Sequence, residues 1–171
     1  GIRTRAYHTD YVQDKASIIC CNHQSFYEIA LLLHTVPRPV FVMKKSLMNV
    51  PIYSWYCRKM GMIAIDRGAV NKDWMKKALK ALSQGKQIVI FPEGTRVPVG
   101  RKISYKAGAF KLAKEANLRI TPATVNAVHV WKDPGFIKRS GTVSLHFHNP
   151  VEPDPDLVRE KIESKLIDEN K

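Results

Sequence analysis

Short apolar segments alternate with amphipathic segments along most of the chain. Runs of about four to eight apolar residues between turn-forming residues are typical of buried strands, whereas apolar positions recurring every three or four residues are typical of helices. This pattern predicts strands at residues 16–21, 40–43, 62–65, 87–91, 119–125 and 142–148. It predicts helices at residues 25–34, 47–59, 71–84, 107–116 and 155–168.

The alternation of strands and helices predicts an α/β fold with a mostly parallel sheet flanked by helices. A length of 171 residues suits a single domain over residues 1–171, with a complete core. Segment 142–148 alternates apolar and polar residues, as a half-exposed strand does. Segment 119–125 contains Pro122, which predicts an edge, a bulge or a strand start, because proline cannot donate to a neighbouring strand.

The composition adds a strong positive charge, a net +13 from 28 Lys and Arg against 15 Asp and Glu. Such a balance implies an anionic partner, which could be nucleic acid, an acidic lipid surface or an acidic carrier protein. The cysteines number three, and Cys20 and Cys21 are adjacent in an apolar run. This usage argues against a disulfide framework and favours a reducing compartment. No signal peptide is visible, and no run approaches the roughly 20 apolar residues of a spanning helix.

The most informative polar residues follow the first predicted strand, in the order Asn-His-Gln-Ser-Phe-Tyr-Glu from Asn22 to Glu28. Near neutral pH the His23 imidazole can take a proton from a hydroxyl, and the Glu28 carboxylate can hold its tautomer and stabilise the cation. On one helix these positions point roughly 140° apart. The pair can therefore serve one site only with His23 at the strand exit and Glu28 in the first turns of the helix. A surface pair at a helix start is the alternative.

Ser25 lies within the same segment, and its hydroxyl is interpreted as a capping or positioning group rather than a nucleophile. The sequence contains no Gly-x-Ser-x-Gly elbow, which a serine nucleophile of an α/β-hydrolase would need.

Two more predicted strands are each followed by an arginine. The segment Pro-Glu-Gly-Thr-Arg, residues 92–96, follows the strand at 87–91. Its glycine allows a turn with positive φ, and the planar fork of Arg96 suits two oxygens of a phosphate. The strand predicted at 62–65 is likewise followed by Asp66 and then Arg67. A solvated arginine in a loop is the alternative for each.

Together and in this order, these segments resemble the glycerolipid acyltransferases, most closely the bacterial 1-acylglycerol-3-phosphate (lysophosphatidic acid) acyltransferases. The resemblance runs from about Gly1 to about Pro150. Its most specific feature is Asn-His-Gln-Ser followed by Phe-Pro-Glu-Gly-Thr-Arg at the exit of a later strand. The chain departs from the family pattern at Glu28, where the family has Asp, so the carboxylate is one methylene further from the backbone.

The resemblance implies transfer of a fatty acyl group from an acyl thioester to the free hydroxyl of 1-acylglycerol 3-phosphate (lysophosphatidate), which gives phosphatidic acid in phospholipid biosynthesis. The thioester would be that of coenzyme A or of acyl carrier protein. His23 would act as the general base, with Glu28 orienting it. The acceptor phosphate would be bound by Arg67, Glu93, Gly94, Thr95 and Arg96. An activated thioester requires no enzyme nucleophile and no cofactor.

Metal chemistry is not expected. His146 and His148 are spaced on one strand face as metal ligands can be, but no third ligand accompanies them. Pro122 is linked less clearly to the acyl donor by the same resemblance.

The implied setting is peripheral, at the cytoplasmic face of an anionic membrane, without a nucleic-acid partner. Family members often carry N-terminal membrane helices and this chain opens with Gly1, so loss of an N-terminal anchor is an open alternative. Another alternative acceptor is glycerol 3-phosphate or another lysophospholipid. The alternative of a different class is a non-catalytic basic module that binds anionic lipid, such as phosphoinositide, or nucleic acid.

One segment bears directly on a membrane. Residues 41–62 contain most of the methionines together with Tyr53, Trp55, Tyr56, Arg58 and Lys59. Aromatic rings with flanking cations suit a lipid–water interface, and flexible thioethers suit an acyl groove. Plain core packing explains the same residues, so both interpretations stay open at this stage.

Overall fold

The computed structural model describes residues 1–13, 15–66, 73–98, 100–131 and 138–166. Its strands form one seven-stranded sheet in the order β1-β7-β6-β2-β5-β3-β4. They are β1 (Ile2–Tyr7), β2 (Ser17–Cys21), β3 (Pro39–Lys44), β4 (Ile63–Ile65), β5 (Gln87–Ile90), β6 (Ile120–Asn126) and β7 (Gly141–Phe147). Every neighbouring pair is parallel except β6 with β7. The predicted mostly parallel sheet is therefore confirmed.

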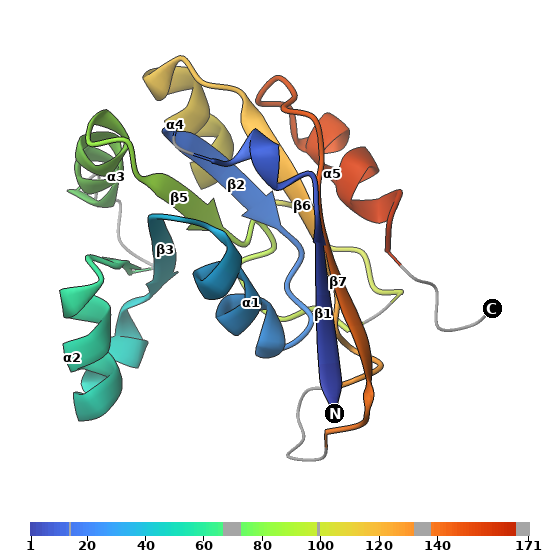
Figure 1. Cartoon of the computed structure of the whole chain (residues 1–171). Helices are drawn as coiled ribbons and strands as arrows, with labels where there is room; N and C mark the ends of the chain where they lie inside the picture. The colour runs from blue at the N-terminus through green and yellow to red at the C-terminus, as the bar shows by residue number, and fades with distance from the viewer. Residues whose placement is uncertain (14, 67–72, 99, 132–137, 167–171) are drawn as a thin grey trace.

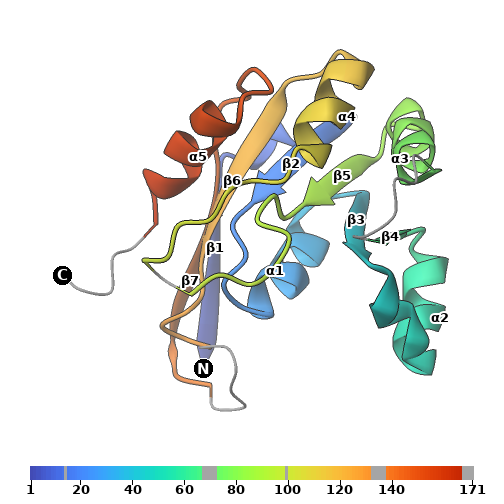
Figure 2. The same ribbon diagram turned by 180° about the vertical axis from the view of Figure 1, so that it is seen from behind.

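The helices cover both faces of this sheet. They are α1 (Tyr27–Thr35), α2 (Pro51–Lys59), α3 (Asp73–Ser83), α4 (Gly108–Ala116) and α5 (Pro155–Glu163), with short 3₁₀ turns η1 (Thr9–Tyr11) and η2 (Lys45–Asn49). Helix α1 lies on the face turned to the viewer in Figure 1, and α3 and α4 lie on the face turned to the viewer in Figure 2. Helix α2 stands beyond the end of β3, beside the sheet edge formed by β4.

Strand β2 is the centre of both cores. Ile18 and Cys20 pack with residues of α3, α4 and α5, whereas Ile19 and Cys21 pack with residues of α1. All four side chains are completely buried. A strand that is apolar on both faces is typical of the middle of a parallel sheet, and the run at 16–21 had this pattern.

The connections reverse direction at β2. The chain leaves β2 through α1 toward β3 on one side, and it leaves β5 through α4 toward β6 on the other side. In open α/β sheets such a switch point leaves a crevice at the carboxyl ends of the strands, and ligands bind there. Residues that follow β2, β5 and β6 therefore meet at one end of the sheet.

Pro51 divides the helix predicted over 47–59. The structure has η2 up to Asn49 and then α2, which begins with Pro51 at its first position. Proline has no N–H to donate, and its ring clashes with the preceding turn. It is therefore tolerated at the start of a helix, but a helix that approaches it from the N-terminal side stops before it. The single-helix prediction was wrong for this reason.

Pro122 does not lie at a sheet edge, so that alternative was wrong. Strand β6 is interior, between β2 and β7. The antiparallel ladder with β7 begins at Ala123, and an isolated bridge joins Ile120 to Val151. Pro122 falls between the ladder and the bridge, where β6 does not need its missing N–H. Between these two pairings the segment from Phe147 to Val151 has one residue more than β6, so the extra residue lies in that segment and not at Pro122.

Strand β1 was not predicted from the sequence. Its residues are exposed apart from the half-buried Ile2, so they lack the alternation of a half-buried strand. Backbone pairing with β7 at the edge of the sheet forms this strand.

Candidate active site

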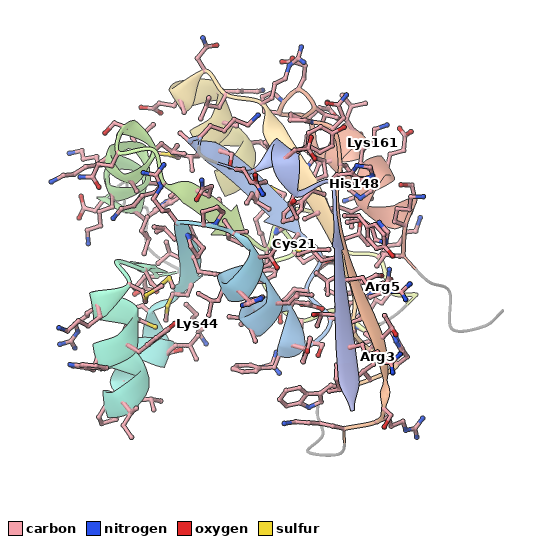
Figure 3. All side chains as sticks on the ribbon, viewed as in Figure 1. Arg3, Arg5, Cys21, Lys44, His148 and Lys161 are labelled. Carbon is pink, nitrogen blue, oxygen red and sulfur yellow. The ribbon has the colours of Figure 1, made fainter. Side chains whose placement is uncertain are left out.

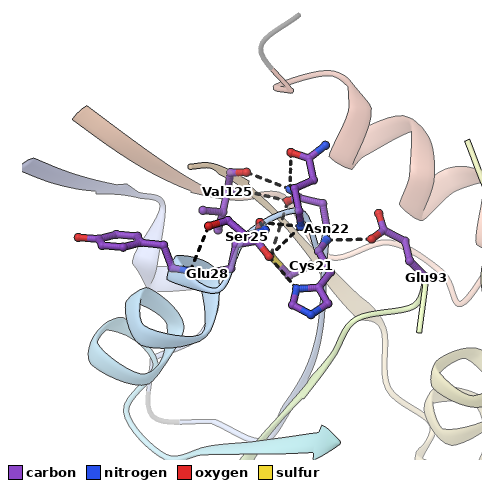
Figure 4. Close-up of polar contacts among 9 residues, drawn as sticks. Cys21, Asn22, Ser25, Glu28, Glu93 and Val125 are labelled. Atoms are coloured by element: carbon purple, nitrogen blue, oxygen red, sulfur yellow. Dashed lines mark hydrogen bonds and ion pairs between the residues drawn. The ribbon is translucent and has the colours of Figure 1, made fainter. Parts of the chain in front are cut away.

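His23 and Glu28 meet at the carboxyl end of β2. His23 follows the last strand residue by two positions, and Glu28 is the second residue of α1. The imidazole Nδ1 lies 2.9 Å from a carboxylate oxygen of Glu28, and the contact is drawn as a dashed line in Figure 4. The placement predicted from the spacing of the two residues, with one at the strand exit and one in the first helical turn, is the one observed.

Glu28 is held by the loop as well as by the imidazole. One carboxylate oxygen accepts hydrogen bonds from the backbone N–H groups of Gln24 and Ser25, each at 2.8 Å. The side chain is fully buried, yet these donors and the positive end of the α1 dipole compensate the charge. Ser25 accepts from the Tyr27 N–H at 3.2 Å, which agrees with the positioning role expected of its hydroxyl.

Asn22 fixes the point at which the loop leaves the sheet. Its amide donates to the Val125 carbonyl at 2.9 Å and accepts from the Val125 N–H at 2.8 Å. The side chain thereby imitates a further strand pairing between β2 and β6 (Figure 4). Sequence reasoning gave Asn22 no role, although a buried amide directly after an apolar strand is a usable signal, because buried polar groups must find partners.

Segment 93–97 is anchored to the backbone of His23 at both of its ends. The His23 N–H donates to a carboxylate oxygen of Glu93 at 2.9 Å, and the Val97 N–H donates to the His23 carbonyl at 2.7 Å. Thr95 and Arg96, which are exposed, lie in the turn between these anchors. The structure thus brings the second predicted block to the first, over 70 residues of chain.

Gly94 makes this turn possible. Its φ of 72° lies in the left-handed region, which residues with a Cβ rarely adopt. A Cβ there would also come within 3.4 Å of the Lys106 side chain. The requirement for glycine was expected from the sequence, and the geometry confirms it.

Phe91 orients the imidazole from the side. Its ring stacks on that of His23 with centroids 4.1 Å apart and planes 19° apart. Phe91 was predicted only as a strand residue, because the pattern of apolar residues cannot tell which aromatic ring contacts which polar group. The imidazole is therefore fixed by the carboxylate at Nδ1 and by the ring of Phe91.

Glu93 has unusual electrostatics. Burial raises the pKa of Glu93, the hydrogen bond from the His23 N–H lowers it and the Glu28 charge raises it, so that the net pKa is about 8. A carboxyl with that pKa is largely protonated at neutral pH, so it has an O–H to donate while it still accepts from His23. Burial also raises the pKa of the Cys20 thiol to about 12, so this group is no nucleophile near neutral pH.

A pocket of about 260 Å³ opens beside Gln24 and Glu93. The loop before α4 and the helix α5 form its other walls, which carry the cations Arg101, Lys102 and Arg159. Arg159 donates to the Ile103 carbonyl at 3.2 Å, and its guanidinium lies 4.6 Å from the centre of the Tyr105 ring. The pocket therefore combines these cations with the carboxylate of Glu163, which pairs with Lys102 at 3.1 Å.

Arg67, the remaining predicted phosphate ligand, lies outside the described residues. Among the residues that the structure does describe, no three His, Cys, Asp or Glu side chains gather as a metal site would require. His146 stacks on Tyr7 with centroids 4.5 Å apart, and His148 contacts the Thr124 hydroxyl at 2.9 Å.

The geometry can now be compared with known proteins. The model of the acyltransferase family matches residues 3–126, more than half of the chain. The chain belongs to the acyltransferase family. The matched region contains both anchored blocks, including His23, Glu28 and the turn at 93–97.

Curated relatives and a solved structure agree with this membership. A 1-acyl-sn-glycerol-3-phosphate acyltransferase of Pseudomonas aeruginosa is 32% identical over 85% of this chain and 58% of its own length. One of Helicobacter pylori is 32% identical over 85% of this chain and 65% of its own length. The crystal structure of the 1-acyl-sn-glycerophosphate acyltransferase PlsC of Thermotoga maritima superposes with a TM-score of 0.79 at 25% identity, covering 95% of this chain and 70% of that one. The chain thus spans between half and two thirds of these two curated relatives.

Proposed function

We propose that this chain is a 1-acylglycerol-3-phosphate O-acyltransferase, which moves a fatty acyl group from an acyl thioester to lysophosphatidate and yields phosphatidic acid for phospholipid biosynthesis. The observation that carries the proposal is the 2.9 Å contact between His23 and Glu28 at the switch point of the sheet. The names of the two curated relatives and of the superposed structure support it.

The pair performs general-base catalysis. In the tautomer that donates from Nδ1 to Glu28, the lone pair of His23 is on Nε2. This nitrogen takes the proton of the acceptor hydroxyl as its oxygen attacks the thioester carbonyl, and Glu28 stabilises the imidazolium. When the tetrahedral intermediate collapses, the C–S bond breaks, and the leaving thiolate takes the proton from the His23 imidazolium, which becomes neutral again. The ester and a free thiol are the products.

The acceptor phosphate is assigned to the turn at 93–97 and to Arg67. Glu93 and Val97, at the two ends of this turn, both bond to the His23 backbone. Thr95 and Arg96 lie between these two residues and are therefore held near the general base. Arg96 supplies a bidentate fork and Thr95 a hydroxyl, while Gly94 permits the turn and Glu93 holds it to His23. The cationic pocket beside Glu93 suits further phosphate groups of acceptor or donor.

His23→Ala tests the proposal. Incubation with lysophosphatidate and acyl-coenzyme A should release free thiol with the wild type, and the variant should lose about 10²–10⁴-fold in kcat, as expected for a general base. His34→Ala, which removes an exposed imidazole at the end of α1, is the matched control and should keep full activity. A His23→Ala variant with more than a tenth of the wild-type kcat would contradict the assignment.

Arg96→Lys tests the phosphate assignment. Replacing the fork with a point charge should raise KM for lysophosphatidate by about tenfold, and it should matter much less for a monoacylglycerol acceptor. Arg119→Lys, at an exposed arginine paired with Glu152, is the control. Equal losses with the phosphorylated and unphosphorylated acceptors would show that Arg96 does not recognise the phosphate.

The donor, coenzyme A or acyl carrier protein, is to be decided by the same assay with both thioesters. Glycerol 3-phosphate and other lysophospholipids are the alternative acceptors. If the wild type is inactive with every combination of donor and acceptor, the non-catalytic binding module becomes the better explanation. Residues 1–171 are proposed as one acyltransferase domain, because β7 and α5 lie beyond the matched residues but complete the same sheet and core.

The enzyme is proposed to work as a peripheral protein on the cytoplasmic face of an anionic membrane. Within residues 1–166, leaving aside the short stretches that the structure does not describe, no helix has the length and apolar character to cross a bilayer. The lipid acceptor and the net charge of +13 support contact with anionic headgroups.

A further inference from the structure

The surface formed by residues 45–59, here called the η2–α2 face, is unusually apolar. Eight large apolar side chains are exposed in the described part of the chain, and five of them lie on this face, namely Leu47, Val50, Ile52, Trp55 and Tyr56. Ile52 is 84% exposed and Trp55 is 63% exposed. Plain core packing, one of the two interpretations of this segment, is therefore excluded for Trp55. The side chain of Tyr53 lies outside the described part of the structure.

Helix α2 presents these residues on one side. Cys57 and Ser54 are buried toward the body of the protein, and the element that α2 packs against most is η2. With 100° between successive residues, the exposed positions from Arg58 round to Tyr56 span an arc of roughly 160°. The arc mixes apolar side chains with cations, and Lys59 Nζ lies 5.7 Å from the centre of the Trp55 ring.

The charged residues of the segment that forms this face have one sign. The chain contains no Asp or Glu between Glu28 and Asp66. Lys44 precedes η2, Lys45 begins it, and Arg58 and Lys59 end α2. Figure 3 labels Lys44 next to α2. An apolar surface with cations beside it is complementary to the boundary between the acyl chains and headgroups of an anionic bilayer.

A hollow of about 610 Å³ lies between η2 and α2. Asn49, Ser54, Arg58 and Lys59 line it, with Trp55 at its side. Ser54 is only 3% exposed, and its hydroxyl has no hydrogen-bond partner within the described structure. This hydroxyl is shut off from solvent, so a ligand in the hollow would meet the side chains of Arg58 and Lys59 instead. Their positive charges suit a phosphate group.

The η2–α2 face lies at the same end of the molecule as the catalytic pair. It follows β3, and His23 follows the parallel strand β2, so both are at the carboxyl ends of the strands (Figure 1). A second cluster of rings and a cation is at this end, because Phe26, 45% exposed, packs on Trp131, and Lys138 Nζ lies 4.5 Å from the Trp131 ring centre.

We propose that the η2–α2 face docks this protein on a bilayer of anionic glycerophospholipid. Ile52 and Trp55 lie at the level where headgroups meet acyl chains, and Arg58 and Lys59 at the hollow hold the phosphate of one lipid headgroup. The docking itself does not depend on the proposed acyl transfer. If that transfer is correct, docking at this end brings His23 to the level at which the hydroxyl of a membrane-bound lysolipid lies.

Vesicle flotation tests the docking, with phosphatidylcholine vesicles that contain or lack phosphatidylglycerol. Each cation near an anionic surface contributes about 1 kcal/mol, so Arg58→Gln with Lys59→Gln should weaken binding to the anionic vesicles about 20- to 30-fold. The matched control is Lys111→Gln with Lys114→Gln, which removes two exposed charges on α4. Equal losses for both pairs would overturn the proposal, because they would show attraction by overall charge alone.

The apolar contribution to docking is tested with a second pair of substitutions. Ile52→Ser with Trp55→Ser should lower the binding that survives high salt about tenfold or more, since exposed rings and aliphatic chains lose their burial in lipid. Leu157→Ser, at an exposed leucine on α5, should leave it unchanged. Lipids brominated in the acyl chain should quench the fluorescence of the wild type, and Trp55→Phe should remove much of that quenching. Unaltered quenching in Trp55→Phe would refute insertion at this face.

His23→Ala should bind vesicles as the wild type does, so failure of the docking and failure of the proposed catalysis are distinguishable.

Discussion

At the scale of single residues, the geometry of the site depends on the length of the Glu28 side chain. Glu28 extends from the first turn of α1 to two backbone N–H groups and to the His23 imidazole. Aspartate occupies this position in the family pattern, and its carboxylate is one methylene nearer the backbone. The surrounding loop of this chain is therefore fitted to the longer side chain.

Changing Glu28 should separate charge from reach. Glu28→Gln keeps the length but turns an amide NH₂ toward backbone donors and removes the charge that stabilises an imidazolium. We expect kcat to fall about 10- to 100-fold, less than for His23→Ala, and stability to fall by about 1–3 kcal/mol. Glu28→Asp keeps the charge and should retain measurable activity, although the carboxylate withdraws by about 1.5 Å. Activity assays and urea unfolding of both variants check this. Inactivity of Glu28→Asp together with full activity of Glu28→Gln would contradict it.

Glu93 should make stability depend on pH. Burial raises its folded pKa from 4.5 to about 8, so between these values the folded protein binds more protons than the unfolded chain. Stability from this group is then complete below pH 4.5 and is lost as pH rises through 8, with a slope of at most about 1.4 kcal/mol per pH unit.

The clearest window for this test is pH 6.5 to 8. Burial lowers the pKa of His148 to about 4 and also lowers that of His146, so both give the opposite slope below 6.5. Urea unfolding of the wild type across the window should show falling stability, and Glu93→Gln should remove most of the fall. A slope that is the same in both proteins would show that Glu93 is not its source.

At the scale of elements, polar side chains buried in the sheet set where the last helix lies. Thr124 of β6 is completely buried, donates to the Ile162 carbonyl of α5 at 2.8 Å and contacts His148 Nε2 at 2.9 Å. Asn126 adds a hydrogen bond to the Lys165 carbonyl at 2.9 Å. Figure 3 shows His148 close to Lys161 of α5. The wall of the cationic pocket that α5 forms therefore depends on β6.

Thr124→Val should loosen this helix. Valine has the same shape but leaves the Ile162 carbonyl and the His148 ring without their partner, so we expect a loss of about 1–3 kcal/mol in the free energy of unfolding. Amide hydrogen exchange should accelerate first in α5. Thr142→Val, at an exposed position of β7, is the control and should change stability by less than about 0.5 kcal/mol. Uniformly faster exchange without preference for α5 would contradict the local role.

At the scale of the whole molecule, a net charge of +13 repels itself. Self-repulsion destabilises the compact state, and salt screens it as the Debye length falls from about 30 Å at 0.01 M to about 8 Å at 0.15 M. We expect Tm to rise by a few degrees over this range, while binding to anionic vesicles weakens. Calorimetry at several salt concentrations measures the first effect. A Tm that falls on the addition of salt would argue against repulsion as the dominant electrostatic contribution.

The sequence by itself determined the class of the fold and much of the site. Burial on one face or on two imposes the periodicity of apolar residues, so this periodicity revealed the alternation of strands and helices. The spacing of His23 and Glu28 required a strand exit followed by a helix. The turn at Gly94 follows from local backbone chemistry, and the structure confirms both.

Tertiary structure alone decided which distant groups meet. The backbone of His23 forms hydrogen bonds with Glu93 and Val97, and its ring stacks on Phe91. Asn22 bonds to the backbone of Val125. These residues are far apart in the sequence, and they meet because parallel strands bring their carboxyl ends to one edge of the sheet. Strand β1 exists through pairing with β7, since its exposed residues carry no pattern of burial. The exposure of Trp55 was likewise undecidable beforehand, because an amphipathic helix has the same sequence pattern whether its apolar side meets a core or a membrane.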